Sequence, residues 1–275
     1  MIPNRSVYAA LLLFVACRPA DKPVDAKVAL RYHPPAGAVY RYAIEQHNTM
    51  TMEAGPFAGM GAQQLALIMH LTQAVTGPAD SGVGVRLTFD STRMEAPGMP
   101  AAMMDEAMGR LKGKSTDVVF DERMRVVKSG TSDMPPEMAT AIKTMAFAFP
   151  EAPVGRGDSW SVETELPLGQ MAGVHAQGRT TLTVKEINVA GGDTTVVLGV
   201  ETTFPTGPIE LNIQGQRATL RLAGALSGDQ VFSLTRGTAV TGSMKGKMKM
   251  NLSGGPLGRG GMAISADTDV SLRLR

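Results

Sequence analysis

Apolar and polar residues alternate with a period of two along most of the chain. In residues 38–53, the odd-numbered positions from Val39 to His47 fall on one face of an extended segment, and the even-numbered positions from Tyr40 to Asn48 fall on the other. Alternation of this length is typical of antiparallel strands that bury one face. Segments rich in Gly, Asp and Ser, such as residues 77–82, separate successive runs and favour hairpin turns.

The same pattern continues to the C-terminus. The next two stripes contain Leu65, Leu67, Met69 and Leu71, and then Val83, Val85, Leu87 and Phe89. Further apolar stripes lie in residues 160–166, 182–187, 196–200, 211–213, 220–222, 231–234, 242–252 and 262–274. We expect about ten to twelve strands, many of them longer than the usual five or six residues. Long strands predict a mainly β fold, a long antiparallel curved sheet of half-barrel or barrel-like form.

Two segments depart from the strand period and predict two short inserted helices. In residues 100–111, the apolar positions Met104, Met108 and Leu111 have helical spacing, and Pro100 suits a first helical turn. In residues 135–149, the apolar positions with helical spacing are Met138, Ile142, Met145 and Phe149, and Pro150 follows. Residues 117–128, between the two helices, predict a hairpin that turns at Asp121 and Glu122.

The first residues predict export. Arg5 precedes an apolar run from Val7 to Val15, which is shorter than the roughly 20 residues of a membrane span and fits a secretory signal. Phe14-Val15-Ala16-Cys17 follows and resembles the bacterial lipobox, although Phe14 stands where Leu is usual. The resemblance implies that Cys17 carries diacylglycerol and becomes the new N-terminus.

This interpretation divides the chain into a lipoprotein signal peptide (1–16), a lipidated tether (17–27) and one β-rich domain (28–275). The only cysteine is Cys17, so no disulfide is expected in the mature domain. We expect a monomer in the bacterial cell envelope, held to a membrane by its lipid. Arg18, rather than Asp, follows Cys17; by resemblance to sorting rules, this favours the outer membrane, facing the periplasm.

A resemblance in architecture adds an expectation about the fold. Long antiparallel strands with a helical insertion behind a lipobox resemble the LolA/LolB-like and LppX/LprG-like half-barrels. The motifs Pro153-Val154-Gly155-Arg156-Gly157-Asp158-Ser159-Trp160 and Gly228-Asp229-Gln230-Val231-Phe232, with Gly237 beyond, also resemble bacterial lipoproteins of unknown function. The half-barrel resemblance implies a curved sheet closed by helices over an apolar cavity that holds acyl chains. It places no functional residue in this chain.

The chain contains 19 methionines among 275 residues, which allows three interpretations. Methionines on the two helices can form an adaptable lid over an apolar ligand, or they can fill gaps in the core. Met50, Met52, Met69, Met244, Met248 and Met250 could instead offer thioethers to Cu(I). Lys245, Lys247 and Lys249 interleave with the last group, and their charge argues against a nearby cation.

Composition and motifs argue against other classes of function. Lys and Arg number 27 against 25 Asp and Glu, so no basic excess favours a nucleic-acid partner. His33, His47, His70 and His175 lack the spacing of a metal site. No nucleophile motif or phosphate-binding loop is present. We expect neither an enzyme, nor a bound metal, nor a cofactor.

Two function classes remain as leading hypotheses. The first is a membrane-anchored lipoprotein that binds a lipid or acyl chain in a half-barrel cavity. The second is a structural or assembly lipoprotein that contacts other envelope proteins without a ligand. For the first hypothesis, the candidate lid residues are Met104, Met108, Leu111, Met138, Ile142, Met145 and Phe149, and the candidate cavity residues are Leu65, Leu67, Val85 and Leu87.

Overall fold

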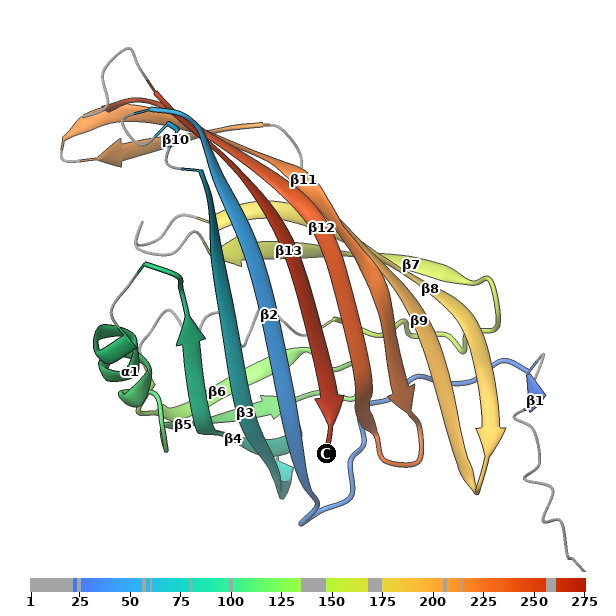
Figure 1. Cartoon of the computed structure of the whole chain (residues 1–275). Helices are drawn as coiled ribbons and strands as arrows, with labels where there is room; N and C mark the ends of the chain where they lie inside the picture. The colour runs from blue at the N-terminus through green and yellow to red at the C-terminus, as the bar shows by residue number, and fades with distance from the viewer. Residues whose placement is uncertain are drawn as a thin grey trace, which may run out of the picture.

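The computed structural model describes residues 22–23, 26–55, 58–59, 61–79, 81–98, 101–134, 147–167, 175–204, 207–213, 215–255 and 261–275. This part of the chain is mainly β, with 13 strands in one sheet and one short helix (Figure 1). The strands are β1 (Lys22–Pro23), β2 (Val39–Ala54), β3 (Ala62–Ala79), β4 (Gly82–Glu95), β5 (Ser115–Phe120), β6 (Val126–Ser132), β7 (Ser159–Pro167), β8 (His175–Ala190), β9 (Asp193–Phe204), β10 (Pro208–Ile213), β11 (Gln216–Ser233), β12 (Thr238–Gly254) and β13 (Met262–Leu274), and the helix is α1 (Ala101–Gly109).

The sheet is antiparallel and open, which confirms the predicted class. Neighbouring strands follow the order β1-β8-β9-β11-β12-β13-β2-β3-β4-β5-β6, while β7 pairs with β8 and β10 with β11. Strands β2 to β6 form one meander, and β7 to β13, apart from β10, form a second. The C-terminal strand β13 joins them, because it pairs with β2 from Tyr42↔Leu274 to Ala54↔Ala263. The hairpin predicted at 117–128 is formed by β5 and β6.

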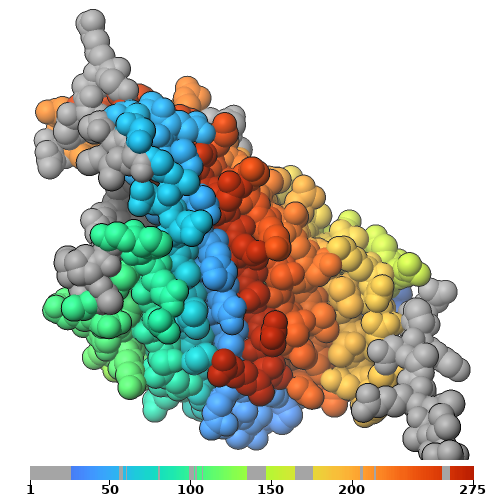
Figure 2. Space-filling view, in the orientation of Figure 1, coloured from blue at the N-terminus to red at the C-terminus, as the bar shows by residue number. Residues whose placement is uncertain are grey.

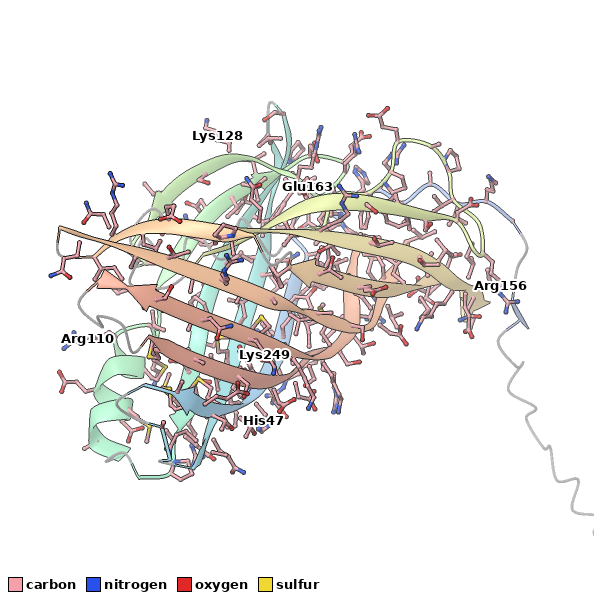
Figure 3. The ribbon with its side chains drawn as sticks, turned by 90° about the horizontal axis from the view of Figure 1, so that it is seen from above. His47, Arg110, Lys128, Arg156, Glu163 and Lys249 are labelled. Atoms are coloured by element: carbon pink, nitrogen blue, oxygen red, sulfur yellow. The ribbon has the colours of Figure 1, made fainter. Side chains whose placement is uncertain are left out.

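The sheet bends into a trough with two chemically different faces (Figures 1 and 3). Successive side chains of a strand point to opposite faces, so register assigns each residue to one side. We call one of the two faces the inner face. It carries the even-numbered residues of β2, β9, β11 and β13, the even-numbered residues of β12 from Gly242 on, and the odd-numbered residues of β3. The outer face carries the alternate residues. Figure 2 shows the outer side, where β2, β13 and β12 form a continuous surface.

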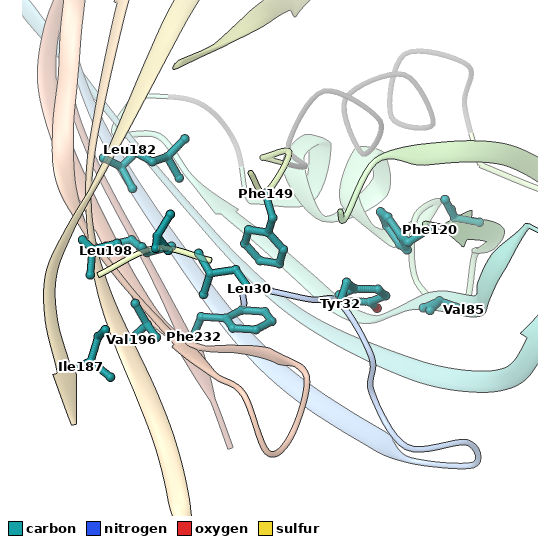
Figure 4. Packing of buried hydrophobic residues seen from close by; sticks show 14 of the residues in the cluster. Leu30, Tyr32, Val85, Phe120, Phe149, Leu182, Ile187, Val196, Leu198 and Phe232 are labelled. Carbon is teal, nitrogen blue, oxygen red and sulfur yellow. The ribbon is translucent and has the colours of Figure 1, made fainter. Parts of the chain in front are cut away.

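The main hydrophobic core fills one end of the trough (Figure 4). Side chains from β4 and β5, such as Val85 and Phe120, lie on one wall, and side chains from β8 and β9, such as Leu182 and Leu198, lie on the other. Residues 28–34 and 147–154, which we call the plug, pass between these walls. Leu30 of the plug is completely buried, so the plug rather than direct wall-to-wall contact closes this end.

Backbone hydrogen bonds tie the plug together and to the β5–β6 turn. Val28 and Val154 exchange backbone hydrogen bonds at 2.8 Å. The Tyr32 N–H donates to the Glu122 carbonyl at 2.8 Å, and the Phe149 N–H donates to the Arg123 carbonyl at 2.9 Å. These bonds satisfy backbone groups that burial would otherwise leave unpaired.

Glycines allow the tight curvature of β11 against β12. A Cβ atom on Gly228 would overlap the Ser243 carbonyl, and one on Gly246 would overlap the Ala225 carbonyl. The two backbones therefore approach more closely than any residue with a side chain would permit, which is a usual reason for glycine inside a strand.

The expectation of two helices needs correction, because the described residues contain one. Helix α1 matches the first prediction. In the second predicted segment, residues 135–146 lie outside the described residues, and residues 147–150 are not helical. Phe149 precedes Pro150, a position that disfavours helical geometry, and its N–H bonds to the β5–β6 turn instead of to a preceding helical turn.

Candidate functional site

The inner face carries an apolar strip that extends beyond the plugged end. Its residues share two properties: they are apolar, and they remain partly exposed in the folded chain. They are Met50, Met52, Leu65, Leu67, Met94, Leu226, Met244, Met248, Met250, Leu252, Met262, Ile264 and Val270. A contiguous apolar surface that the fold leaves partly open is a usual mark of a binding site.

The outer face behind the strip is charged and ion-paired. The Lys245 ammonium lies 2.7 Å from the Asp269 carboxylate, and Lys247 lies 3.1 Å from Asp267. Register also places Lys249 and His47, both labelled in Figure 3, on this outer face. The inner face of β2–β4, β7–β9 and β11–β13 carries no Asp, Glu, Lys, Arg or His among the described side chains.

A cavity of about 170 Å³ lies where the apolar strip meets the plug. Its lining includes Ile44, Leu71, Leu87, Phe120, Met124 and Leu272. Two hydroxyls at its wall are hydrogen-bonded: the Tyr32 hydroxyl accepts from Gln73 Nε2 at 3.0 Å, and the Tyr42 hydroxyl lies 2.8 Å from Thr238 Oγ1. Gln230 adds a side-chain amide to the lining. The cavity therefore offers a mostly apolar interior with a small number of polar groups at its wall, as small-molecule pockets commonly do.

The two phenols in this cavity stay uncharged near neutral pH. Burial raises the pKa of Tyr42 to about 12, and it also raises the pKa of Tyr32 above its ordinary value. Desolvation disfavours the phenolate in each case. The cavity thus adds no charge to the inner face.

Two larger hollows lie on the outer face and are less suited to an apolar ligand. One, of about 440 Å³, borders Lys185 and Asp229, and the other, of about 410 Å³, borders Lys247 and Asp267. Each of these pairs forms an ion pair with substantially exposed side chains. An apolar molecule in either hollow would remove water from these charged groups without offering them hydrogen bonds in its place.

The predicted cavity residues lie on the inner face. Leu65 and Leu67 belong to the apolar strip, and Leu67 also packs against a small cluster formed by Met69, Phe89 and Met134. Val85 and Leu87 are buried in the main core, and Leu87 lines the cavity. The structure thus separates the four residues into two that stay partly exposed and two that support the closed end.

The first helix packs on the inner side of β4. The Thr92 hydroxyl, which lies on the inner face, donates to the Met108 carbonyl at 2.8 Å. Met104 and Leu111 are buried, and Met108 is partly exposed. These positions agree with a helix that borders the trough.

The remaining predicted residues are divided between the core and undescribed segments. Phe149 is buried in the plug, where it contacts Phe232. Met138, Ile142 and Met145 lie outside the described residues, as does Cys17. Within the predicted tether, Lys22 and Pro23 form β1, which pairs with Val189 and Asn188 of β8.

The sequence interpretation missed the role of the methionines on the sheet. It treated Met244, Met248 and Met250 only as potential metal ligands, whereas they form part of the strip, and Lys245, Lys247 and Lys249 lie on the opposite face. The lysine charge is therefore not beside the thioethers, as the sequence argument assumed. The signal that identifies the strip is the alternation itself, with Lys at 245, 247 and 249 and uncharged Met or Gly at the even positions 244–250, because period two assigns the two sets to different faces.

Other kinds of site find little support in the described residues. Within them, no group of three or more His, Cys, Asp or Glu side chains is arranged to hold a metal ion. His70 is engaged structurally, since its Nδ1 lies 2.7 Å from Ser91 Oγ. Helix α1, the one helix in the described ranges, is not long and apolar enough to cross a bilayer.

No protein-family model matches the chain, and no curated protein matches its sequence. Among solved structures, this chain is similar to lipovitellin, in a structure that describes its lipid–protein interactions, with 13% sequence identity and a TM-score of 0.47. The match covers 89% of this chain but only 25% of the lipovitellin chain. DynF from the dynemicin biosynthesis pathway of Micromonospora chersina has 13% identity and a TM-score of 0.25, covering 98% of this chain and 92% of its own. An outer membrane channel from Pseudomonas putida F1 has 10% identity and a TM-score of 0.25, and the match covers 92% of this chain and 99% of the channel chain. At TM-scores below 0.5, these similarities assign no function to this chain.

Proposed function

We propose that this protein is a membrane-anchored envelope lipoprotein that binds an apolar ligand, a lipid or an acyl chain, in its trough. The observation that carries the proposal is the partly exposed apolar strip on an uncharged inner face, set against an ion-paired outer face. Keeping this surface in water is unfavourable by roughly 25 cal/mol per Å² of apolar area. A chain lying along the strip, with its end in the cavity beside Leu87, would remove that cost.

The anchoring part of the proposal comes from the sequence around Cys17. A lipidated Cys17 would hold the domain at the outer membrane, facing the periplasm, with the protein acting as a monomer. β1 follows Cys17 by only a few residues and pairs with the edge of β8. The domain would therefore stay close to the bilayer that supplies or receives its ligand.

A structural lipoprotein is the second candidate, and one observation favours it. The plug already fills one end of the trough, with Leu30 and Tyr32 almost fully buried. If the remaining strip were covered as tightly, the sheet would serve as a packed scaffold without a ligand.

Native mass spectrometry separates the two candidates. The protein is purified as the Cys17→Ser variant, so that its own lipid modification cannot be mistaken for a ligand. We expect an added mass that corresponds to a co-purifying lipid and disappears on organic extraction. A preparation that carries no lipid, and takes up none when incubated with a total bacterial lipid extract, would reject the binding function and leave the structural one.

A further inference from the structure

Three uncharged polar side chains interrupt the apolar strip at its centre. Asn48 of β2 and Thr268 of β13 are register partners, and Gln46 lies on the same face two residues before Asn48. Thr268 Oγ1 donates to Asn48 Oδ1 at 2.9 Å, and Gln46 Nε2 donates to the same oxygen at 3.3 Å. We call these three residues the amide cluster.

The amide cluster retains a hydrogen-bond donor for a ligand. An asparagine side chain has an acceptor oxygen and an NH₂ group with two donor hydrogens. Oδ1 of Asn48 accepts both bonds described above, whereas its Nδ2 has no acceptor among the described residues. No fully buried side-chain nitrogen or oxygen in these ranges lacks a partner, so Nδ2 keeps some exposed surface on the inner face, where Asn48 lies.

A ligand that covered this donor with hydrocarbon alone would pay a penalty. Burying an amide without a hydrogen bond typically costs about 1–3 kcal/mol. A ligand with an ester carbonyl or hydroxyl oxygen at the same point would satisfy Asn48 Nδ2 while its chain lay on the neighbouring strip, beside residues such as Met50 and Leu65.

The same surface disfavours a charged ligand group. No cationic side chain lies on the described inner face of β2–β4, β7–β9 and β11–β13 to pair with a carboxylate or phosphate. The nearest lysines of β12, Lys245 and Lys247, lie on the outer face and are paired with Asp269 and Asp267. An anion at the amide cluster would therefore lose its water without gaining a counter-charge.

We propose that the trough selects uncharged ester lipids of the acylglycerol type, with the ligand's carbonyl or hydroxyl oxygen held by Asn48 Nδ2 and its acyl chain on the apolar strip. This inference rests on the proposed function. It adds that the amide cluster sets the ligand's chemical class and that fatty-acid anions are disfavoured.

The test compares two ligands with the same acyl chain. The full chain with Cys17→Ser is loaded with Nile red, a neutral dye whose fluorescence rises in apolar sites, and the dye is displaced at pH 8 by monolaurin or by laurate. We expect monolaurin to displace the dye at a concentration at least tenfold lower. Equal potency of the two ligands, or a preference for laurate, would overturn the selectivity while leaving apolar binding intact. A protein that binds neither dye nor lipid would overturn the proposed function as well.

Variants of Asn48 test the donor directly. Asn48→Leu removes the donor and adds apolar surface, and Asn48→Asp keeps the oxygen that accepts from Thr268 and Gln46 while removing the NH₂ group. Both should weaken monolaurin binding about fivefold or more, the range of one lost hydrogen bond, and Asn48→Leu should retain Nile red. The matched control is Asn251→Leu on the exposed outer face of β12, which should change neither. Unchanged monolaurin binding in a folded Asn48→Leu or Asn48→Asp variant would contradict the assignment.

Discussion

The rings of Phe149 and Phe232 meet edge to face, with centroids 4.8 Å apart and planes at 73°. Phe149 belongs to the plug and Phe232 to the end of β11, so this contact fastens the plug to the sheet. The plugged end is consequently a tightly packed base from which the open part of the trough extends.

Replacing Phe149 should therefore weaken the whole domain. Phe149→Ala removes a buried ring that is 2% exposed and leaves a cavity, so we expect the free energy of unfolding to fall by about 3–5 kcal/mol. Urea denaturation followed by Trp160 fluorescence measures the change. Val127→Ala is the control, because Val127 is 44% exposed, and it should shift stability by less than about 0.5 kcal/mol. A similarly small effect of Phe149→Ala would show that the plug does not support the fold.

The curvature of the trough should depend on Gly228. A methyl group there would overlap the Ser243 carbonyl, so Gly228→Ala should force β11 and β12 apart and cost roughly 1–3 kcal/mol or more. Gly207→Ala provides the comparison, since nothing lies within 4 Å of the position that its methyl group would take. Thermal melts of the two variants should differ clearly, and equal melting temperatures would mean that the strands do not approach as closely as described.

Stability at high pH should report on Tyr42. Its pKa is raised to about 12 by burial, whereas an unfolded tyrosine titrates near 10. Between pH 10 and pH 12 the Tyr42 hydroxyl is deprotonated in the unfolded chain but still protonated in the folded chain. The contribution of Tyr42 to the free energy of unfolding is therefore fully present below about pH 10 and decreases as the pH rises toward 12. Tyr42→Phe should lower stability at pH 8, because it removes the hydrogen bonds to Thr238 and Ala239, but it should flatten the decrease above pH 10. Parallel pH profiles for the two proteins would refute this origin.

Membrane attachment should require Cys17. We expect Cys17→Ser to move the protein from the membrane fraction to the soluble fraction, because one thiol carries the proposed anchor. Fractionation with immunodetection measures this, and Arg18→Lys serves as the control that keeps the acylation site. If the Cys17→Ser protein sedimented with membranes as the unmodified sequence does, another feature would have to anchor it.

Local periodicity predicted much of this fold, and long-range pairing explains most of what it missed. The alternation in residues 38–53 correctly assigned Tyr42 and Ile44 to one face and Arg41 and Glu45 to the other, because the period of a strand is a local property. The pairing of β13 with β2 joins residues more than two hundred positions apart, and no local pattern encodes it.

The candidate site was predicted in part for the same reason. Leu65 and Leu67 lay on a recognisable apolar face of their strand. Met248 and Met250 were considered only as ligands for a metal, because the strand pairing that places their face on the inner side of the sheet is not visible in the sequence. The helix expected to end at Phe149 is an element that the sequence pattern predicted and that residues 147–150 do not form. Helical spacing of apolar residues was present, but Pro150 and the hydrogen bond to Arg123 favour an extended end.

The most direct test of the central claim is a comparison of Nile red affinity between two adjacent substitutions on β12. Met248 lies on the inner face and is partly exposed, and Lys247 lies on the outer face with its side chain 82% exposed. Met248 also packs against the buried cluster of Ala176, Phe204 and Leu222. Met248→Glu places a carboxylate on the apolar strip, where a bound ligand would strip it of water, so we expect at least a tenfold loss of affinity in a variant that still unfolds cooperatively. Lys247→Glu should bind the dye within twofold of the unmodified sequence. Equal affinity in the two variants, or no binding by the unmodified protein, would contradict the assignment of the inner face as the ligand site.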